Sequence, residues 1–407
     1  MLAERMRTRA NGRARRPRLV TPLFLLVMLS TWAYFTAVGT LQPTLPLFVK
    51  GPLNGTEVQV GLAIGFFAVA AVLTRPFLGS VGDRRGRRVL IVAGAGIVSL
   101  ATLGYLVSES LWVLLIFRLI TGAGEAAFYV GAASVINDLA PDERRGEALS
   151  YFSLALYAGL VVGPVLGETI LGDDNFTAVW LVAALAAGLA ALAGLPVTET
   201  RPEEERAASG DARRIIHPAG LLPGMLLSAS IWGLASFVTF IPLYAREVGL
   251  DGSRMVFVSY SMIIILLRLF GARIPDRLGA PRSAKLALGI QAVGLAVIGL
   301  WATPVGLFAG TAVFAIGHSL AFPALMTIAM RNAPPKERGA VVGTFTAFFD
   351  LSFGLGAVSS GVIAALLGYR GAFVAAGLVA LAGFLTLVFR ARRNNPRDVA
   401  AASMVEG

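Results

Sequence analysis

Ionisable side chains stand deep inside long apolar stretches of this sequence. Arg118, Glu125, His318 and Asp350 are the four that lie deepest. A charged group at the centre of a bilayer costs from about 2.5 to more than 10 kcal/mol, so those that occur in membrane proteins usually face a cavity and take part in function. A carboxyl or imidazole group held there can take up and release a proton. These four residues are our candidates for proton chemistry.

Glu125 is the leading candidate among them. Arg118 and Glu125 are seven residues apart, which on an α-helix places them about 20° apart around the axis and ~10.5 Å apart along it. Tyr129 continues the same stripe one turn later. Two interpretations stay open: Glu125 carries a proton, or it forms a permanent ion pair with Arg118 or His318 that holds helices together. Arg75 and Arg268 lie nearer a helix end, where we expect structural pairing.

The composition requires a lipid environment. Hydrophobic residues make up 56% of the 407 residues and charged residues 14%, against about 45–50% and 25% in soluble domains. Lys and Arg number 35 against 24 acids, but they punctuate apolar segments instead of forming a basic patch, so we expect no nucleic-acid partner. The absence of Cys excludes thiolate metal sites and disulfides. We expect no metal, no cofactor and no enzymatic activity.

The apolar stretches predict an all-α integral membrane protein. A helix needs about 20 mostly apolar residues to cross a hydrocarbon core of ~30 Å. Twelve stretches meet this requirement: 20–49, 58–79, 89–107, 111–138, 148–171, 176–198, 218–245, 254–274, 284–302, 304–331, 340–368 and 371–390. The first has no small-residue cleavage site, so it is expected to be a retained span and not a signal peptide.

The loop charges predict the orientation. Cytoplasmic loops of membrane proteins retain Lys and Arg. The loops on one side hold only Lys50, Arg246, Arg254 and Arg370, whereas the termini and the other loops hold nearly all the rest. We therefore expect a multi-pass protein of the plasma (inner) membrane with both termini in the cytoplasm.

The chain divides into two halves. A hydrophilic segment of mixed charge, residues 199–217, follows the sixth span and is typical of a linker. A shift of 193 residues superposes Arg75 on Arg268 and Glu125 on His318. One offset across several helices indicates parallel repeats related by an axis along the membrane normal. The predicted parts are a basic arm, a first six-helix half, the linker, a second half and a tail: 1–19, 20–198, 199–217, 218–390 and 391–407.

A charged loop carries a family signature. Residues 79–90 read GSVGDRRGRRVL, and the second half contains the weaker copy ARIPDRLGAPR. Asp83 can pair across the interface between the halves or with a neighbouring helix N-terminus, and Gly86 permits a tight turn. The loop resembles the G-x-x-x-D-R-x-G-R-R/K signature of the major facilitator superfamily, over about residues 20–390. The resemblance implies twelve helices in two pseudo-symmetric bundles and a conformational latch; the alternative is that these residues only set topology. The latch residues would be Gly79, Asp83, Arg84, Gly86, Arg87, Asp276, Arg277 and Gly279.

The fifth span carries a second motif. Its sequence GLVVGPVLGE, residues 159–168, resembles the signature of drug and metabolite antiporters in the superfamily, with Glu168 in place of the final Gly. Small residues four apart let a neighbouring helix approach closely, and Pro164 bends the helix. We predict a hinge at Gly159, Gly163, Pro164 and Gly167, with simple packing as the alternative. Glu168 lies near the external boundary, where we expect it to be solvated.

The fourth span resembles the R-x-x-x-G motif of the superfamily in Arg118 and Gly122. In the superfamily, spans one, four, seven and ten line the cavity. The resemblance therefore implies cavity positions for Glu125 and His318 and for a polar or aromatic set consisting of Tyr34, Gln42, Tyr129 and Trp232.

Taken together, these features predict a secondary transporter that acts as a monomer on a small-molecule solute. Proton-coupled efflux of a drug-like or metabolite-like compound is the preferred hypothesis, because of the fifth-span motif. Proton-coupled uptake is the alternative within the same class. A non-transporting membrane receptor or scaffold is the alternative from another class; it would not explain ionisable groups at the midplane.

Overall fold

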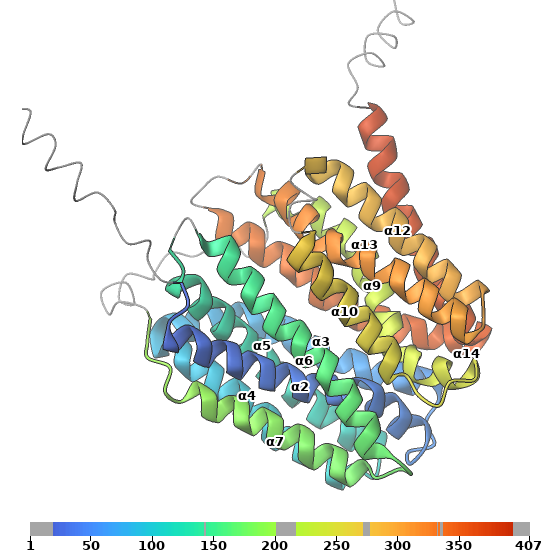
Figure 1. Cartoon of the computed structure of the whole chain (residues 1–407), viewed down its shortest axis with the longest axis horizontal. Coiled ribbons are helices and arrows are strands. Elements are labelled where there is room, and N and C mark those ends of the chain that lie inside the picture. The colour runs from blue at the N-terminus through green and yellow to red at the C-terminus, as the bar shows by residue number, and fades with distance from the viewer. Residues whose placement is uncertain are drawn as a thin grey trace, which may run out of the picture.

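The computed structural model describes residues 19–141, 144–200, 217–271, 277–331, 333 and 337–393. Within these segments every regular element is a helix (Figure 1). Most of the predicted arm, linker and tail, and also Asp276, lie outside the described residues. The elements are α2 (Pro22–Lys50), α3 (Glu57–Arg85), α4 (Arg87–Leu103), the short 3-10 helix η1 (Gly104–Val107), α5 (Leu111–Leu139), α6 (Arg145–Leu171), α7 (Phe176–Gly194), α9 (Pro218–Glu247), α10 (Arg254–Phe270), α12 (Ala280–Leu300), α13 (Pro304–Arg331) and α14 (Arg338–Arg393).

These helices supply the twelve predicted spans. In the described part of the chain, ten helical segments are long and apolar enough to cross a membrane. The helix α10 has 17 residues and is slightly shorter. The helix α14 contains two spans, because Gly368 interrupts its helical backbone at φ 71°, a conformation that glycine adopts without a steric cost. The boundary predicted between 340–368 and 371–390 falls at this glycine, and the prediction of twelve helices is confirmed.

The outer surface of the helices is apolar. Phe270, Leu366 and Trp112 are 84%, 77% and 72% exposed, and many other large apolar side chains are exposed as well. Soluble proteins rarely expose so much apolar surface. The first N–H groups of a helix have no partner within the helix, and side chains can satisfy them. At the start of α3, Thr56 Oγ1 accepts from Gln59 N (3.3 Å) and Gln59 Oε1 accepts from Thr56 N (2.9 Å).

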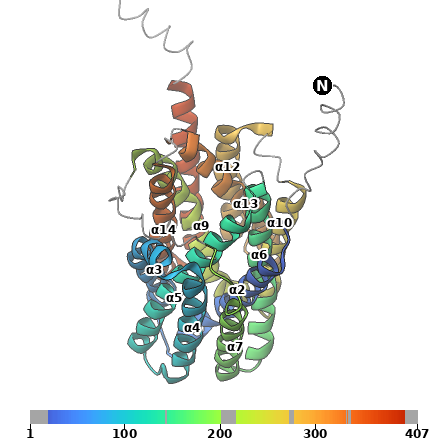
Figure 2. The ribbon, with the colours of Figure 1, turned by 90° about the vertical axis from the view of Figure 1, so that its left-hand side faces the viewer.

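The helices form two bundles, α2 to α7 and α9 to α14 (Figures 1 and 2). The bundles meet along three helix pairs, namely α3 with α14, α6 with α10 and α2 with α9. The 193-residue offset places α3 on α10, α6 on the first part of α14, and α2 on α9. The first two pairs are therefore repeats of each other, and the third joins two equivalent helices. This is the pseudo-symmetry that the sequence predicts.

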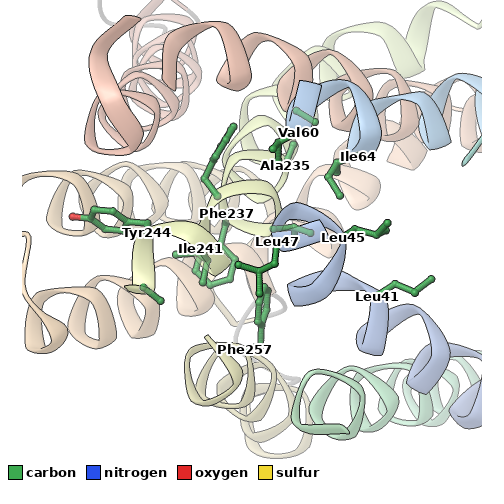
Figure 3. Close-up of a cluster of buried hydrophobic side chains, with 14 of the residues drawn as sticks. Leu41, Leu45, Leu47, Val60, Ile64, Ala235, Phe237, Ile241, Tyr244 and Phe257 are labelled. Carbon is green, nitrogen blue, oxygen red and sulfur yellow. The ribbon is translucent and has the colours of Figure 1, made fainter. Parts of the chain in front are cut away.

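The bundle has two ends, which differ in how the halves are joined. We call the end where α2 begins and α14 ends the terminal face, and the end with the loop from Lys50 to Glu57 the opposite face. One buried apolar cluster at the opposite face takes side chains from both halves. Towards the terminal face each half has a cluster of its own. Figure 3 shows part of the shared cluster, with side chains from α2 (Leu41, Leu45, Leu47), α3 (Val60, Ile64), α9 (Ala235, Phe237, Ile241, Tyr244) and α10 (Phe257). The halves are thus joined at the opposite face and packed separately towards the terminal face.

The glycines of the fifth-span motif lie against α2. A Cβ added at Gly159 would lie 2.7 Å from Thr36 N, and one added at Gly163 would lie 2.6 Å from the Gly39 backbone. At Gly167 the nearest atom would be the Thr40 carbonyl oxygen at 2.4 Å. Only glycine allows two helix backbones to approach this closely. The predicted seam exists, and its partner is the first span.

We expect Gly159→Leu to destabilise the protein, because α2 and α6 would have to separate to admit the side chain. Overpacking of this kind typically costs about 1–3 kcal/mol. The measurement is thermal unfolding of the purified protein in detergent. The control is Gly96→Leu in the middle of α4, where an added Cβ meets nothing within 4 Å. Equal melting temperatures for the two variants would show that the seam does not require glycine.

Candidate functional site

An ion pair joins the two halves. Arg75 on α3 and Asp350 on α14 approach to 3.0 Å between Nε and Oδ2, with side chains 21% and 8% exposed. Neither atom has a hydrogen-bond partner, so the contact is a charge pair without hydrogen-bond geometry. The Arg75 guanidinium also lies over the Tyr129 ring, 5.7 Å from its centre. The structural pairing predicted for Arg75 is found, and its partner is one of the four proton candidates.

In the second half, the arginine equivalent to Arg75 contacts a tyrosine ring in place of a carboxylate. Arg268 on α10, the counterpart of Arg75, lies over the ring of Tyr157 on α6 at 5.2 Å. Tyr157 and Asp350 are themselves 193 residues apart. The geometry of the contact is therefore repeated, whereas the carboxylate is present on one side only.

Glu125 carries a buried carboxyl oxygen with no partner. Its Oε2 atom makes no hydrogen bond within the described residues. The charges that act on Glu125 are those of Arg75, Asp350 and Arg118. A buried carboxylate is stable only when a counter-charge and hydrogen bonds compensate it. Glu125 has nearby charges and no hydrogen bond to Oε2, which suits a group that changes its protonation state.

Arg118 does not form the ion pair with Glu125 that was one of the two interpretations left open. Its Nε donates to the Ala63 carbonyl at 2.7 Å and its Nη2 to the Ile64 carbonyl at 3.4 Å. The guanidinium also lies over the Phe67 ring at 4.7 Å. These three contacts are on α3, so the long side chain leaves the stripe that it shares with Glu125. Within the described residues, Arg118 is a link between α5 and α3.

His318 lies among aromatic rings in the second half. Its ring centre is 5.8 Å from that of Phe314 and 6.1 Å from that of Tyr260. The side chain is buried, and Nδ1 has no partner in the described structure. No ion pair between His318 and Glu125 is present among the described residues, so the structure contains neither of the permanent pairs that the sequence left open.

The predicted cavity residues lie at different depths of burial. Tyr34 is fully buried and stacks on Phe128 with ring centres 3.9 Å apart, and its hydroxyl has no partner in the described structure. Gln42 and Trp232 are half-buried on α2 and α9. Trp232 packs against Gly356 of α14. The unpartnered hydroxyl makes Tyr34 the member of this set with unused hydrogen-bonding capacity.

The signature loop forms its described contacts within the first half. Arg87 pairs with Asp138 at the end of α5, and its backbone N–H donates to Glu199 Oε1 at 3.1 Å. Thr200 Oγ1 donates to the same Asp138 at 2.7 Å. Gly86 adopts φ 99°, where a side chain would strain the backbone and collide with Glu199. The loop therefore ties α3 and α4 to α5 and to the segment that follows α7.

The remaining predicted latch residues make no described contact between the halves. Arg84 and Arg277 are exposed, and Gly279 has φ 78°, the repeat of the Gly86 turn. The Asp83 side chain and Asp276 lie outside the described residues, and Gly79 belongs to α3. A contact of Asp83 across the halves stays a prediction.

Glu168 forms a clamp between the halves that the sequence does not predict. Its Oε1 accepts from Ser253 N at 2.7 Å and from Ser253 Oγ at 2.5 Å, and its Oε2 accepts from Arg254 N at 2.8 Å. The carboxylate thus satisfies free N–H groups at the positive N-terminal end of α10. The expectation that Glu168 is simply solvated is wrong. Its departure from the family pattern was the available signal.

The clamp borders a cleft at the opposite face. The cleft has a volume of about 410 Å³ and includes Glu168, Arg246, Asp251 and Arg254 in its lining. A second cleft of about 320 Å³ lies at the same face beside Tyr105. Neither contains the ion pair or Glu125. No cluster of His, Asp and Glu in the described residues could hold a metal ion.

We expect Glu168→Ala to loosen the closure of the opposite face. The chain has no Cys, so a single Cys in place of Ser261, which is 2% exposed on α10, reports on access to the interface between α6 and α10. Its labelling by a water-soluble maleimide should become faster in Glu168→Ala and stay unchanged in Asp173→Ala, which removes an exposed carboxylate from the same face. Equal labelling rates in all three backgrounds would mean that Glu168 does not hold the face closed.

We expect Arg75→Ala to destabilise the protein strongly, because Asp350 would be left as an uncompensated buried charge. Removal of one partner of a buried pair typically costs about 3–5 kcal/mol. The double variant Arg75→Ala with Asp350→Ala removes both charges and should recover much of this loss. Thermal unfolding in detergent measures both effects, and additive losses in the double variant would contradict a direct pair.

Comparisons with known proteins agree with this architecture. The model of the Major Facilitator Superfamily matches residues 27–308 and 251–406. An uncharacterized MFS-type transporter of Salmonella typhimurium is 28% identical over 367 residues, or 86% of this chain and 91% of that protein. The uncharacterized MFS-type transporter YhhS of Escherichia coli is 27% identical over 400 residues, or 95% of this chain and 96% of that protein. The crystal structure of a POT family transporter in complex with 5-aminolevulinic acid has a TM-score of 0.77 at 13% identity, over 92% of this chain and 96% of that chain. This chain belongs to the major facilitator superfamily.

Proposed function

We propose that the protein exports a small solute in exchange for protons, and that Glu125 is the group that takes up and releases the proton. As a member of its superfamily the chain is a secondary transporter in the membrane; the coupling ion, the direction and the role of Glu125 are the proposal. The observation that carries it is the buried Oε2 of Glu125, which has no partner although the charges of Arg75 and Asp350 act on the residue.

Protonation of Glu125 would control the ion pair between the halves. When Glu125 is ionised, two carboxylates, its own and that of Asp350, attract Arg75. When Glu125 is protonated, only Asp350 does. Interactions between charges are much stronger in a protein interior than in water, so the proton would strengthen the hold of Arg75 on Asp350 and thereby the contact of α3 with α14. This links a proton to the relative position of the halves.

The packing supports alternating access as the transport mechanism. The halves share an apolar cluster at the opposite face and have separate clusters towards the terminal face. With both termini in the cytoplasm, as the loop charges predict, this would be a state closed to the outside. Export then requires the opposite face to open. Opening would break the contacts of Glu168 with α10, and the predicted hinge in α6, at its seam with α2, would allow the helix to move.

The driving force is sufficient for export. One proton moving through 100 mV contributes ~2.3 kcal/mol, and one pH unit adds ~1.4 kcal/mol. Together these support a solute gradient of roughly a few hundred-fold. Export is preferred over uptake because the fifth span resembles that of antiporters and its glycine seam is present in the structure.

We expect Glu125→Gln to abolish uphill transport but to keep solute exchange. The amide has the shape of the protonated acid and cannot release a proton. Proteoliposomes with an imposed pH gradient would first be screened with the unmodified protein against a panel of labelled solutes. With the best solute, the variant should exchange labelled for unlabelled compound without a gradient and should fail to move it uphill. Glu109→Gln, at an exposed carboxylate, is the control and should do both.

Other outcomes of this experiment would redirect or overturn the proposal. Uphill transport by Glu125→Gln would remove Glu125 from the mechanism and leave Asp350 as the candidate. Loss of folding, detected by thermal unfolding, would assign Glu125 a structural role. Movement of solute in the same direction as protons would establish uptake.

A further inference from the structure

We propose that Arg268 and His318 bind the anionic group of the transported solute, a carboxylate or a similar oxyanion. The inference rests on the proposed function in taking the protein to be a transporter of a small solute, and it places the solute between α6 and α10, where Arg268 lies over Tyr157. It adds the chemical class of the solute, an organic anion with an apolar or aromatic body.

Both residues have a buried nitrogen without a partner. Arg268 Nε and His318 Nδ1 are each inaccessible to solvent and make no hydrogen bond within the described residues. The charge of Arg268 acts on the His318 ring, so the two groups lie in the same part of the second half. Buried hydrogen-bonding groups in proteins are nearly always satisfied, and exceptions call for an explanation. An acceptor supplied by a ligand would satisfy Arg268 Nε, and also His318 in the tautomer that carries its proton on Nδ1.

The repeat shows what is missing beside Arg268. Its counterpart Arg75 has the carboxylate of Asp350 at 3.0 Å, whereas Arg268 has the ring of Tyr157 in the equivalent place. A tyrosine ring attracts a cation but does not neutralise it. The same fold therefore holds one arginine with a counter-charge and one without. The Arg268 side chain is half-buried and its Nε is inaccessible to solvent, so an anion bound there would supply both the counter-charge and a hydrogen-bond acceptor.

No other described acid takes this place. Of the acids within the spans, Asp350 pairs with Arg75, and the charges of Arg75, Asp350 and Arg118 act on Glu125. The third arginine, Arg118, already donates to two backbone carbonyls. Of these three arginines, Arg268, in the last turn of α10, is thus the one with neither an ion pair nor a hydrogen bond in the described structure.

The surroundings indicate the rest of the ligand. Tyr157 faces Arg268, and Tyr260 and Phe314 lie within 6.1 Å and 5.8 Å of the His318 ring centre. A guanidinium binds a carboxylate through two parallel hydrogen bonds. Aromatic walls favour an apolar body and stack on a ring. A small aromatic or aliphatic carboxylate fits both features, whereas an organic cation would meet Arg268 with like charge.

The test compares acids with their amides. The probes are benzoate, phenylacetate and naphthoate and the three corresponding primary amides, each added to the full chain in a neutral detergent at fixed pH and ionic strength. Thermal unfolding gives the stabilisation and, from its concentration dependence, Kd. We expect at least one acid to bind and its amide not to bind. Arg268→Gln should weaken that acid by roughly 10- to 100-fold, Arg268→Lys should weaken it less, and Arg282→Gln, at an exposed arginine on the terminal side of α12, should leave it unchanged.

Three results would overturn the inference: equal binding of acids and amides, binding unaffected by Arg268→Gln, or no binding by any of the acids. A lipid headgroup is tested by adding phosphatidylglycerol to the detergent. The site belongs to lipid and not to solute if this lipid raises the unfolding temperature, loses this effect in Arg268→Gln, displaces the acids and is not itself transported. The assay uses no pH gradient, so it is independent of proton coupling. Glu125→Gln should bind the acid whether or not it retains uphill transport. Failure of the binding proposal can therefore be distinguished from failure of the proton-coupling proposal.

Discussion

The organisation of the interior follows from the cost of placing a charge where there is no water. A buried ion is tolerated when an opposite charge and hydrogen bonds compensate it. Arg118 is compensated within one half by hydrogen bonds to the carbonyls of α3. Arg75 is compensated across the halves by the opposite charge of Asp350. The second solution makes the relative position of α3 and α14 depend on the charges around Arg75. Glu125 is one of those charges, and this dependence is the physical basis of the proposed coupling.

The apolar packing between the halves differs between the two faces of the bundle. A cluster shared by both halves would resist separation at the opposite face, and separate clusters near the terminal face would let each half keep its own packing in the proposed transport cycle. The hydrogen bonds of Glu168 to the start of α10 add a polar contact that can be broken without exposing an apolar core. Glycines bring α2 and α6 into close contact within the first half, and a hinge at this seam stays a prediction. Movement of one half against the other with a contact that can be broken is what alternating access requires.

Much of this architecture could be predicted from the sequence, because hydrophobic length fixes the spans and one offset fixes the repeat. The offset also contained the equivalence of Tyr157 and Asp350, but the partner of Arg75 required knowledge of which helices meet. Helix geometry placed Arg118 and Glu125 on one stripe and left a pair between them open, but it could not show that the long guanidinium reaches carbonyls on a neighbouring helix. The contacts of Glu168 could not be predicted for a related reason: two of its three donors are backbone groups 85 and 86 residues away, and backbone donors do not appear in the sequence pattern.

The central claim is that Glu125 changes its protonation state. Infrared difference spectroscopy of the purified protein tests it most directly, because a protonated carboxyl group has a carbonyl stretching band separate from those of carboxylates and amides. The account predicts a band from a buried carboxyl group that appears and disappears as pH is varied over the range in which transport occurs. The band should be absent in Glu125→Gln. A titrating band that persists unchanged in that variant, or no titrating band in the unmodified protein, would contradict the account.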